Sequence, residues 1–280
     1  QKTFEMERKN RKMAKQTKGF CKYCGKEYTR GGMLRHLSAC GERKKVLEAE
    51  TGKRKCGYYE LLLMGRYNKN YWLIIEIRET ATLRELDQFI RDIWVECCGH
   101  LSEFNIAGQR YEVLPDEDFF WDEPSKSMEY KLSSVLSAGM EFTYEYDYGS
   151  TTELIVKVQE YRIGIWKKEA VTILSRNNPP EIICSVCGKN PAEWVNPEGF
   201  YTGEPFLCEK CLKKKKEDRE MEEDEYEEED EYMLDDGWMD EDFLLPICNS
   251  PRMGVCGYCG SEKYPDKFVP DIMIIEEKNQ

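Results

Sequence analysis

The sequence predicts an α+β protein in which one β-grasp (ubiquitin-like), two-layer domain is flanked by small zinc-binding modules. The first observation is a series of aromatic and β-branched segments, grouped around one amphipathic segment, between residues 56 and 178. The second is that four C-x-x-C pairs lie outside this series, at a spacing that lets two thiolates reach one ion. The third is a hydrophobic content of 40% in 280 residues, which indicates a buried core, while no apolar run approaches the roughly 18 residues of a membrane-spanning helix.

The first half of the predicted domain consists of two strands and a helix. Residues 58–67 and 71–79 are rich in aromatic and β-branched residues and are separated by the turn signal "NKN". Residues 80–96 predict a helix, because their apolar side chains recur on one face. Thr82 is its expected N-cap and Glu85, three residues later, the partner in a capping box. The apolar face consists of Leu83, Leu86, Phe89, Ile90, Ile93 and Trp94.

The second half of the predicted domain adds strands and a short helix. The order strand, strand, helix, strand, strand, short helix, strand is that of a β-grasp, with one helix on one face of a mixed sheet. The later segments are strands at 102–107 and 109–114, a helical turn at 131–136, strands at 140–148 and 151–162, and a further strand at 170–176.

Composition divides the chain into seven segments. The acidic and lysine-rich stretch after residue 212 is of low complexity, and its lysine-to-acid order is compatible with a helical portion. The segments are a basic flexible lead (1–19), a CCHC zinc finger (20–41), a charged linker or helix (42–55), the β-grasp domain (56–178), a four-cysteine zinc ribbon or knuckle (181–212), an acidic tract (213–242) and a C-terminal Cys-containing segment (243–280).

The thirteen cysteines point to zinc rather than to disulfides. The start of the sequence is charged and lacks the apolar core of a secretory signal, which favours a soluble, cytoplasmic protein with reduced thiols. The first predicted site has the spacing C-x2-C-x11-H-x3-C, close to a two-Cys, two-His finger with its last ligand replaced by cysteine. Tyr28 and Met33 would form its small apolar core. Its ligands are Cys21, Cys24, His36 and Cys40.

This finger is better suited to phosphates than to bases. In the familiar finger, helix positions −1, 3 and 6 contact bases, and these fall on Thr29, Gly32 and Arg35. Glycine has no side chain to read with, and one finger covers only about three base pairs. A strip of basic side chains predicts sequence-independent contact with phosphates of DNA or RNA. The strip consists of Lys18, Lys22, Lys26, Arg30 and Arg35.

The remaining cysteines suggest a second zinc site and a third cluster. Four thiolates would close the coordination sphere of the second site, which makes it structural; its ligands are Cys184, Cys187, Cys208 and Cys211. The third cluster, Cys248, Cys256 and Cys259, lacks a fourth ligand and would need an aspartate or a rearranged pairing with the second cluster. We expect two zinc ions, or three if this cluster binds one. Free buried thiols are expected at Cys56, Cys97 and Cys98.

Residues 56–162 resemble the plasmid pRi ORF-three-like (passenger TnpR-like) domain family. The resemblance rests on "YELLL", "TATLRELDQFIRDIW", "GHLSEFNIAGQRY" and "FTYEYDYG". "SVCG", "CEKC" and "NSPRMGVCGYCG" also resemble modules that accompany some members. The family is mostly of uncharacterised function. Ser150, Thr152 and Leu154 stand where its members carry a second aspartate, a tryptophan and a histidine, and only His100 remains of two histidines. These departures imply a scaffold rather than a catalyst.

The predicted function is therefore a non-enzymatic zinc-binding protein that associates with nucleic acid. Seventeen Lys and Arg against six Glu give residues 1–55 a net charge of +11. His100 is expected to be a packed or capping histidine, and no nucleophile, phosphate loop, membrane segment or small-molecule site is evident. The alternative is a protein–protein adaptor that uses the β-grasp domain, with purely structural zinc sites and an aromatic hot spot at Phe119, Phe120 and Trp121.

The acidic tract suggests a regulatory role. Seventeen Asp and Glu against Arg219 give residues 217–242 a net charge of −16. This tract either folds back on the basic region and competes with phosphates, or is a solvated linker.

Overall fold

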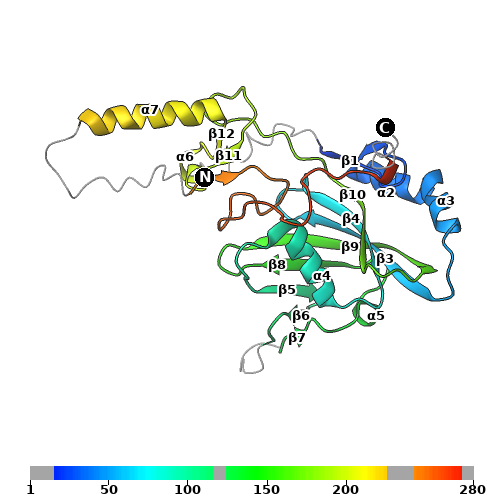
Figure 1. Ribbon diagram of the computed structural model, residues 1–280. Helices are drawn as coiled ribbons and strands as arrows, with labels where there is room; N and C mark the ends of the chain where they lie inside the picture. The colour runs from blue at the N-terminus through cyan, green and yellow to red at the C-terminus, as the bar shows by residue number, and fades with distance from the viewer. Residues whose placement is uncertain (1–15, 116–123, 226–242, 273–280) are drawn as a thin grey trace.

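The computed structural model describes residues 16–115, 124–225 and 243–272 of the chain (Figure 1). Three segments of the sequence that were discussed above lie wholly or partly outside these residues. They are residues 1–15 of the basic lead, the aromatic triplet Phe119, Phe120 and Trp121, and residues 226–242 of the acidic tract.

The centre of the molecule is an eight-stranded sheet. Its strands are β3 (Lys55–Gly65), β4 (Trp72–Arg78), β5 (Ser102–Ile106), β6 (Gln109–Glu112), β7 (Lys126–Ser127), β8 (Glu141–Tyr146), β9 (Thr152–Ile165) and β10 (Val171–Arg176). They lie in the spatial order β10-β4-β3-β9-β8-β5-β6-β7. Within the described residues, β6 and β7 run parallel and the other neighbours antiparallel. Each strand predicted from the sequence is therefore present.

One helical segment lies across the sheet (Figure 1). It consists of α4 (Leu83–Ile90) and a π-helical turn, η1 (Arg91–Val95); the short α5 (Leu132–Val135) follows later. No helix in the described part of the chain is both long and apolar enough to cross a membrane. The α+β prediction is confirmed as a mixed arrangement of sheets with few helices, and the finer β-grasp assignment stays a prediction.

The predicted capping box at the start of α4 is confirmed. The Thr82 hydroxyl accepts a hydrogen bond from the Glu85 N–H at 3.2 Å, and the Glu85 carboxylate accepts one from the Thr82 N–H at 2.8 Å. Two N–H groups that the helix leaves without partners are thereby satisfied.

Thr82→Ala is expected to lower the free energy of unfolding by about 1 kcal/mol, because the Glu85 N–H loses its acceptor. Equilibrium urea denaturation measures the change. Thr151→Ala is the matched control, since Thr151 is exposed and lies outside the helices and strands. Equal midpoints for the two variants would contradict the capping role.

The strands β3 and β4 are buried on both faces. On the face covered by α4 lie Leu61, Leu63, Leu73, Ile75 and Ile77. The opposite face of the same strands belongs to a separate core, formed by Leu62, Met64, Trp72 and Ile74 with Leu174 of β10. Near-continuous burial of a strand indicates that both faces are covered.

The N-terminal module covers this second face. It consists of β1 (Lys18–Phe20), β2 (Glu27–Thr29), α2 (Arg30–Ala39) and α3 (Gly41–Glu48). Met33 and Leu37 of α2 are 0% and 1% exposed and pack against Trp72 and Ile74 in the second core. The charged stretch predicted at 42–55 is helical in its first half, as α3.

A second small module follows the sheet. It contains β11 (Trp194–Val195), α6 (Gly199–Thr202), β12 (Phe206–Leu207) and α7 (Glu209–Glu225). Residues 243–272, here called the C-terminal segment, add β13 (Leu245–Pro246) to β11. The segment then contacts the main sheet, where Asn249 accepts hydrogen bonds from Arg176 at 2.6 Å and Asn177 at 2.7 Å.

Candidate metal centres

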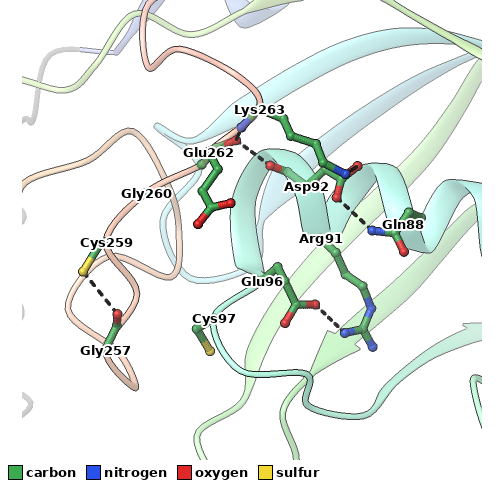
Figure 2. Close-up of a pocket in the computed structure, with 11 residues that line it drawn as sticks. Gln88, Arg91, Asp92, Glu96, Cys97, Gly257, Cys259, Gly260, Glu262 and Lys263 are labelled. Atoms are coloured by element: carbon green, nitrogen blue, oxygen red, sulfur yellow. Dashed lines mark hydrogen bonds and ion pairs between the residues drawn. The ribbon is translucent and has the colours of Figure 1, made fainter.

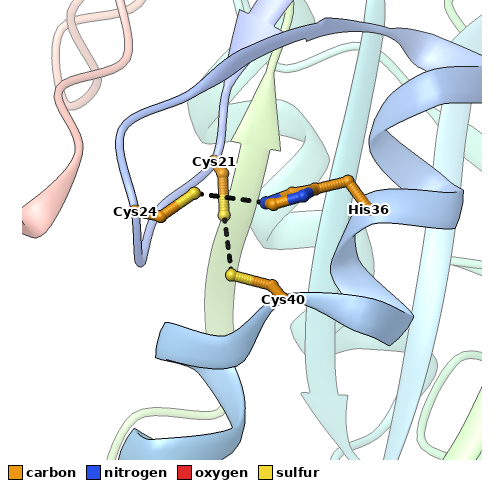
Figure 3. Close-up of side chains that lie close together, drawn as sticks. All are labelled: Cys21, Cys24, His36 and Cys40. Carbon is orange, nitrogen blue, oxygen red and sulfur yellow. Dashed lines mark hydrogen bonds between the residues drawn. The ribbon is translucent and has the colours of Figure 1, made fainter.

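The first cluster of metal-ligand side chains lies in the N-terminal module (Figure 3). Cys21 and Cys24 come from the turn between β1 and β2, His36 from α2, and Cys40 from the junction of α2 and α3. The Cys24 Sγ lies 3.2 Å from the His36 Nε2, and the Cys21 Sγ lies 4.0 Å from the Cys40 Sγ. All four ligand atoms are within 4.8 Å of one another, so they can surround one tetrahedral ion.

The local backbone brings the two thiols of the turn together. The N–H of Cys21 donates to the carbonyl of Lys26 at 2.9 Å, and that of Gly25 to the carbonyl of Cys21 at 3.0 Å. Gly25 has a φ of 68°, which a residue with a side chain rarely adopts. The Tyr28 ring stacks on the His36 ring at 4.4 Å between centroids and holds the imidazole in place.

Burial shifts the pKa values of two ligands in this cluster. Burial raises the pKa of the Cys21 thiol to about 12, so this thiol is protonated at neutral pH unless a cation stabilises the thiolate. Burial and then the charge of Lys26 lower the pKa of His36. The imidazole is therefore neutral, which is the form that coordinates a metal.

The second cluster lies in the second module. Its ligand atoms, from Cys184, Cys187, Cys208 and Cys211, are also within 4.8 Å of one another. The Cys187 and Cys208 sulfurs are 4.0 Å apart, and the Asn190 amide donates to the Cys208 sulfur at 3.5 Å. This hydrogen bond, followed by one from the backbone N–H of Cys211, lowers the pKa of Cys208 to about 6. Four thiolates leave no position for water, so this centre is suited to a structural role.

The structure corrects the third predicted cluster. Cys256 lies with Cys97, Cys98 and His100, whose ligand atoms are all within 4.8 Å of one another. Cys248 and Cys259 lie outside this group: Cys248 is 5% exposed, and the Cys259 thiol contacts the carbonyl of Gly257 at 3.3 Å. Cys256 therefore groups with residues far away in the sequence and not with Cys259 of its own C-x-x-C pair. The backbone between the two is irregular, since Cys256 and Gly257 both have a left-handed φ, of 50° and 68°.

The structure also tests what was expected of Cys56, of the pair Cys97 and Cys98, and of His100. Cys98 is exposed and Cys97 half-buried, so neither is the free buried thiol that was expected; Cys56, at 5% exposed, is buried and belongs to no cluster. His100 is not only a packed histidine, because its Nε2 faces two sulfurs. The run Cys97-Cys98-Gly99-His100 is a local signal that could have indicated ligands. All thirteen cysteines are free thiols.

The predicted phosphate-binding strip is largely occupied by the protein itself. Lys18 lies 3.7 Å from the Glu27 carboxylate, Lys22 lies 2.7 Å from Asp271, and Arg30 donates to the carbonyl of Lys69 at 2.8 Å. The two remaining members, Lys26 and Arg35, have exposed side chains with no ion pair among the described residues.

The fold and the clusters together define a class of protein: a mixed α/β domain whose Cys and His groups could hold metal ions. Residues 62–188 match the family model described as plasmid pRiA4b ORF-3-like protein. This match confirms the resemblance to that family and carries it beyond residue 162, through β10 to Cys184 and Cys187.

Comparisons with individual proteins add little. A comparison with curated proteins finds no match. Among solved structures, the chain is similar to the crystal structure of a protein of unknown function from Methanosarcina mazei Go1, with 20% identity and a TM-score of 0.35. That similarity covers 44% of this chain and 68% of the other.

Proposed function

We propose that this protein is a non-enzymatic zinc-binding protein that contacts the phosphate backbone of nucleic acids through its N-terminal region. The observation that carries the proposal is the position of α2. Its apolar side chains, Met33 and Leu37, are buried against the main sheet, while Arg35 lies on the exposed side. The finger is therefore both a cover for the sheet and a carrier of positive charge.

Zinc is the metal that these ligand sets favour. Thiolate and imidazole ligands in a tetrahedral arrangement suit Zn²⁺, which needs no redox partner. Four protein ligands close the coordination sphere in each of the first two centres, so neither leaves a position for substrate. Thirteen free thiols suit the reducing cytoplasm, which is the location that we propose.

Contact with phosphates would be independent of base sequence. Gly32 occupies a base-reading position of the finger helix, and the available cations are Lys26 and Arg35, with further lysines in residues 1–15. A lysine or arginine that neutralises a phosphate releases counterions, so the binding should weaken steeply as salt rises.

The double variant Lys26→Ala, Arg35→Ala is expected to bind oligonucleotides more weakly and to reduce the slope of log K against log salt by about 2. Fluorescence anisotropy of the full chain with duplex and single-stranded probes over a salt series measures both quantities. The control is Lys213→Ala, Lys214→Ala, which removes two exposed cations from α7. Absence of binding by the wild type at low salt, or equal slopes for the two variants, would overturn the proposal.

The second proposal, an adaptor built on the β-grasp assignment of the main domain, depends on the aromatic triplet at 119–121. Because that triplet lies outside the described residues, no observation favours the adaptor over contact with nucleic acid. The proposed competition by the acidic tract depends on residues 226–242, which also lie outside them.

A further inference from the structure

We propose that Cys97, Cys98, His100 and Cys256 bind one zinc ion, and that this ion fastens the C-terminal segment to the ORF-3-like domain. This inference deepens the proposed zinc-binding function and does not depend on contact with nucleic acid. It is carried by the geometry of the four ligands, by the groups behind them, and by the cleft that the fastened segment forms.

The four ligand atoms converge from two distant parts of the chain. Cys97, Cys98 and His100 lie on the loop between η1 and β5, whereas Cys256 lies in the C-terminal segment. The His100 Nε2 is 2.9 Å from the Cys98 Sγ and 3.2 Å from the Cys256 Sγ. The Cys98 Sγ is 3.7 Å from the Cys97 Sγ and 3.8 Å from the Cys256 Sγ. These are separations at which one ion can bind all four atoms.

A carboxylate stands behind the histidine. The Asp147 Oδ1 lies 3.5 Å from the His100 Nδ1, on the side of the ring away from the sulfurs. Histidines that bind metals usually have such a carboxylate at the other ring nitrogen, which sets the tautomer and the orientation of the ring. Asp147 is itself held, because its carboxylate accepts hydrogen bonds from the Gly149 N–H at 3.0 Å and from Arg252 at 2.7 Å.

Arg252 supplies the charge that such a centre needs. Its guanidinium is 0% exposed and lies 3.4 Å from the Cys97 sulfur. It also donates to the Ser150 carbonyl and to the Thr152 hydroxyl, each at 3.1 Å. Three thiolates around a divalent ion leave one negative charge, and a buried guanidinium beside them offsets it. Thr152 stands at a position where the sequence departs from the family pattern, and here its side chain accepts a hydrogen bond from this arginine.

The fastened segment forms one wall of a cleft of about 570 Å³ (Figure 2). The other wall is the end of α4 with η1 and the two residues that follow it, Glu96 and Cys97. Lys263 of the segment pairs with Asp92 of η1 at 2.8 Å. Because six of the eleven lining residues lie between positions 257 and 263, the cleft exists only while the segment is docked. The ion would therefore control whether the cleft is formed.

Native mass spectrometry of the full chain counts the bound ions. The wild type is expected to hold three zinc ions, and Cys256→Ser and Cys98→Ser are each expected to hold one fewer. Cys259→Ser is the matched control and should keep all three, since Cys259 is exposed and outside the group. Limited proteolysis should cut the C-terminal segment faster in Cys256→Ser than in Cys259→Ser.

The outcomes separate this inference from the proposed function. If Cys256→Ser and Cys98→Ser hold as many ions as the wild type, the third centre is refuted while the first two stand. If the wild type holds a single ion and Cys256→Ser holds none, the third centre stands and the zinc-binding proposal for the first two fails. An ion that depends on Cys256 but has the mass of iron would overturn the assignment to zinc. Equal proteolysis of the two variants would overturn the fastening role.

Discussion

The Cys40→Ser variant is expected to lose the ion of the first centre and about 3–6 kcal/mol of its free energy of unfolding. Cys40 joins α2 to α3, so the loss of its sulfur releases both helices from the turn that carries Cys21 and Cys24. Structural zinc contributes to folding directly, because the ligands of the unfolded chain are not assembled.

The magnitude follows from the second core. When α2 detaches, Met33 and Leu37 leave the sheet, and each fully buried side chain of this size is worth about 1.5–3 kcal/mol. Trp72, which is 1% exposed, would be uncovered on the same face. Equilibrium urea denaturation followed by tryptophan fluorescence measures the loss of stability, and a chelator should produce the same state from the wild type.

The matched control is Cys56→Ser. Cys56 is also a buried thiol, at 5% exposed, but it lies in β3 and belongs to none of the three groups. Its replacement should leave the ion count unchanged. Two results would contradict this role of the first centre in holding the N-terminal module on the sheet. One is an equal loss of free energy of unfolding in Cys40→Ser and Cys56→Ser, and the other is a wild type whose stability does not change with a chelator.

Arg43→Met is expected to destabilise the protein by about 3–5 kcal/mol near neutral pH. Arg43 extends from α3 to the second face of the sheet, where it pairs with Glu60 at 2.9 Å and with Glu76 at 3.4 Å. All three side chains are less than 10% exposed. Glu76 keeps Arg162 as a partner at 2.7 Å, but Glu60 would be left as a buried charge without a cation.

The defect of Arg43→Met should shrink as the pH falls. Burial raises the pKa of Glu60 above its ordinary value, with Glu160 and Glu76 adding to the rise while Arg43 opposes it. Without Arg43 the pKa rises further. A carboxyl whose pKa is raised on folding favours the folded state when protonated and opposes it when ionised, so stability is lost as the pH rises through the raised pKa. The difference from wild type should therefore be smaller at about pH 5 than at pH 7.

Glu60→Gln in the Arg43→Met background tests the cause, because it removes the uncompensated charge while keeping the shape of the side chain. Urea denaturation at both pH values should show that the double variant recovers most of the loss and has no extra dependence on pH. A single variant that is as stable as the wild type, or a double variant as unstable as the single one, would contradict this explanation.

Features that depend on neighbouring residues could be predicted from the amino-acid order alone. Strand patterns, the capping box of Thr82 and Glu85, and the ligand sets of the first two centres all follow from local spacing. Within the capping box and within each C-x-x-C pair, the side chains are only three positions apart, so their spacing in the sequence determines how they are placed.

Contacts between distant segments emerge only from the folded arrangement. Cys256 contacts His100 across 156 residues, and Arg252 contacts Asp147 across 105. The spacing of residues within each segment does not indicate which distant segment it contacts. The sequence pattern also predicted a finger without showing that Met33 and Leu37 cover the second face of a sheet. Burial of apolar surface and pairing of buried charge are satisfied only in three dimensions, and they select the partners that local spacing leaves open.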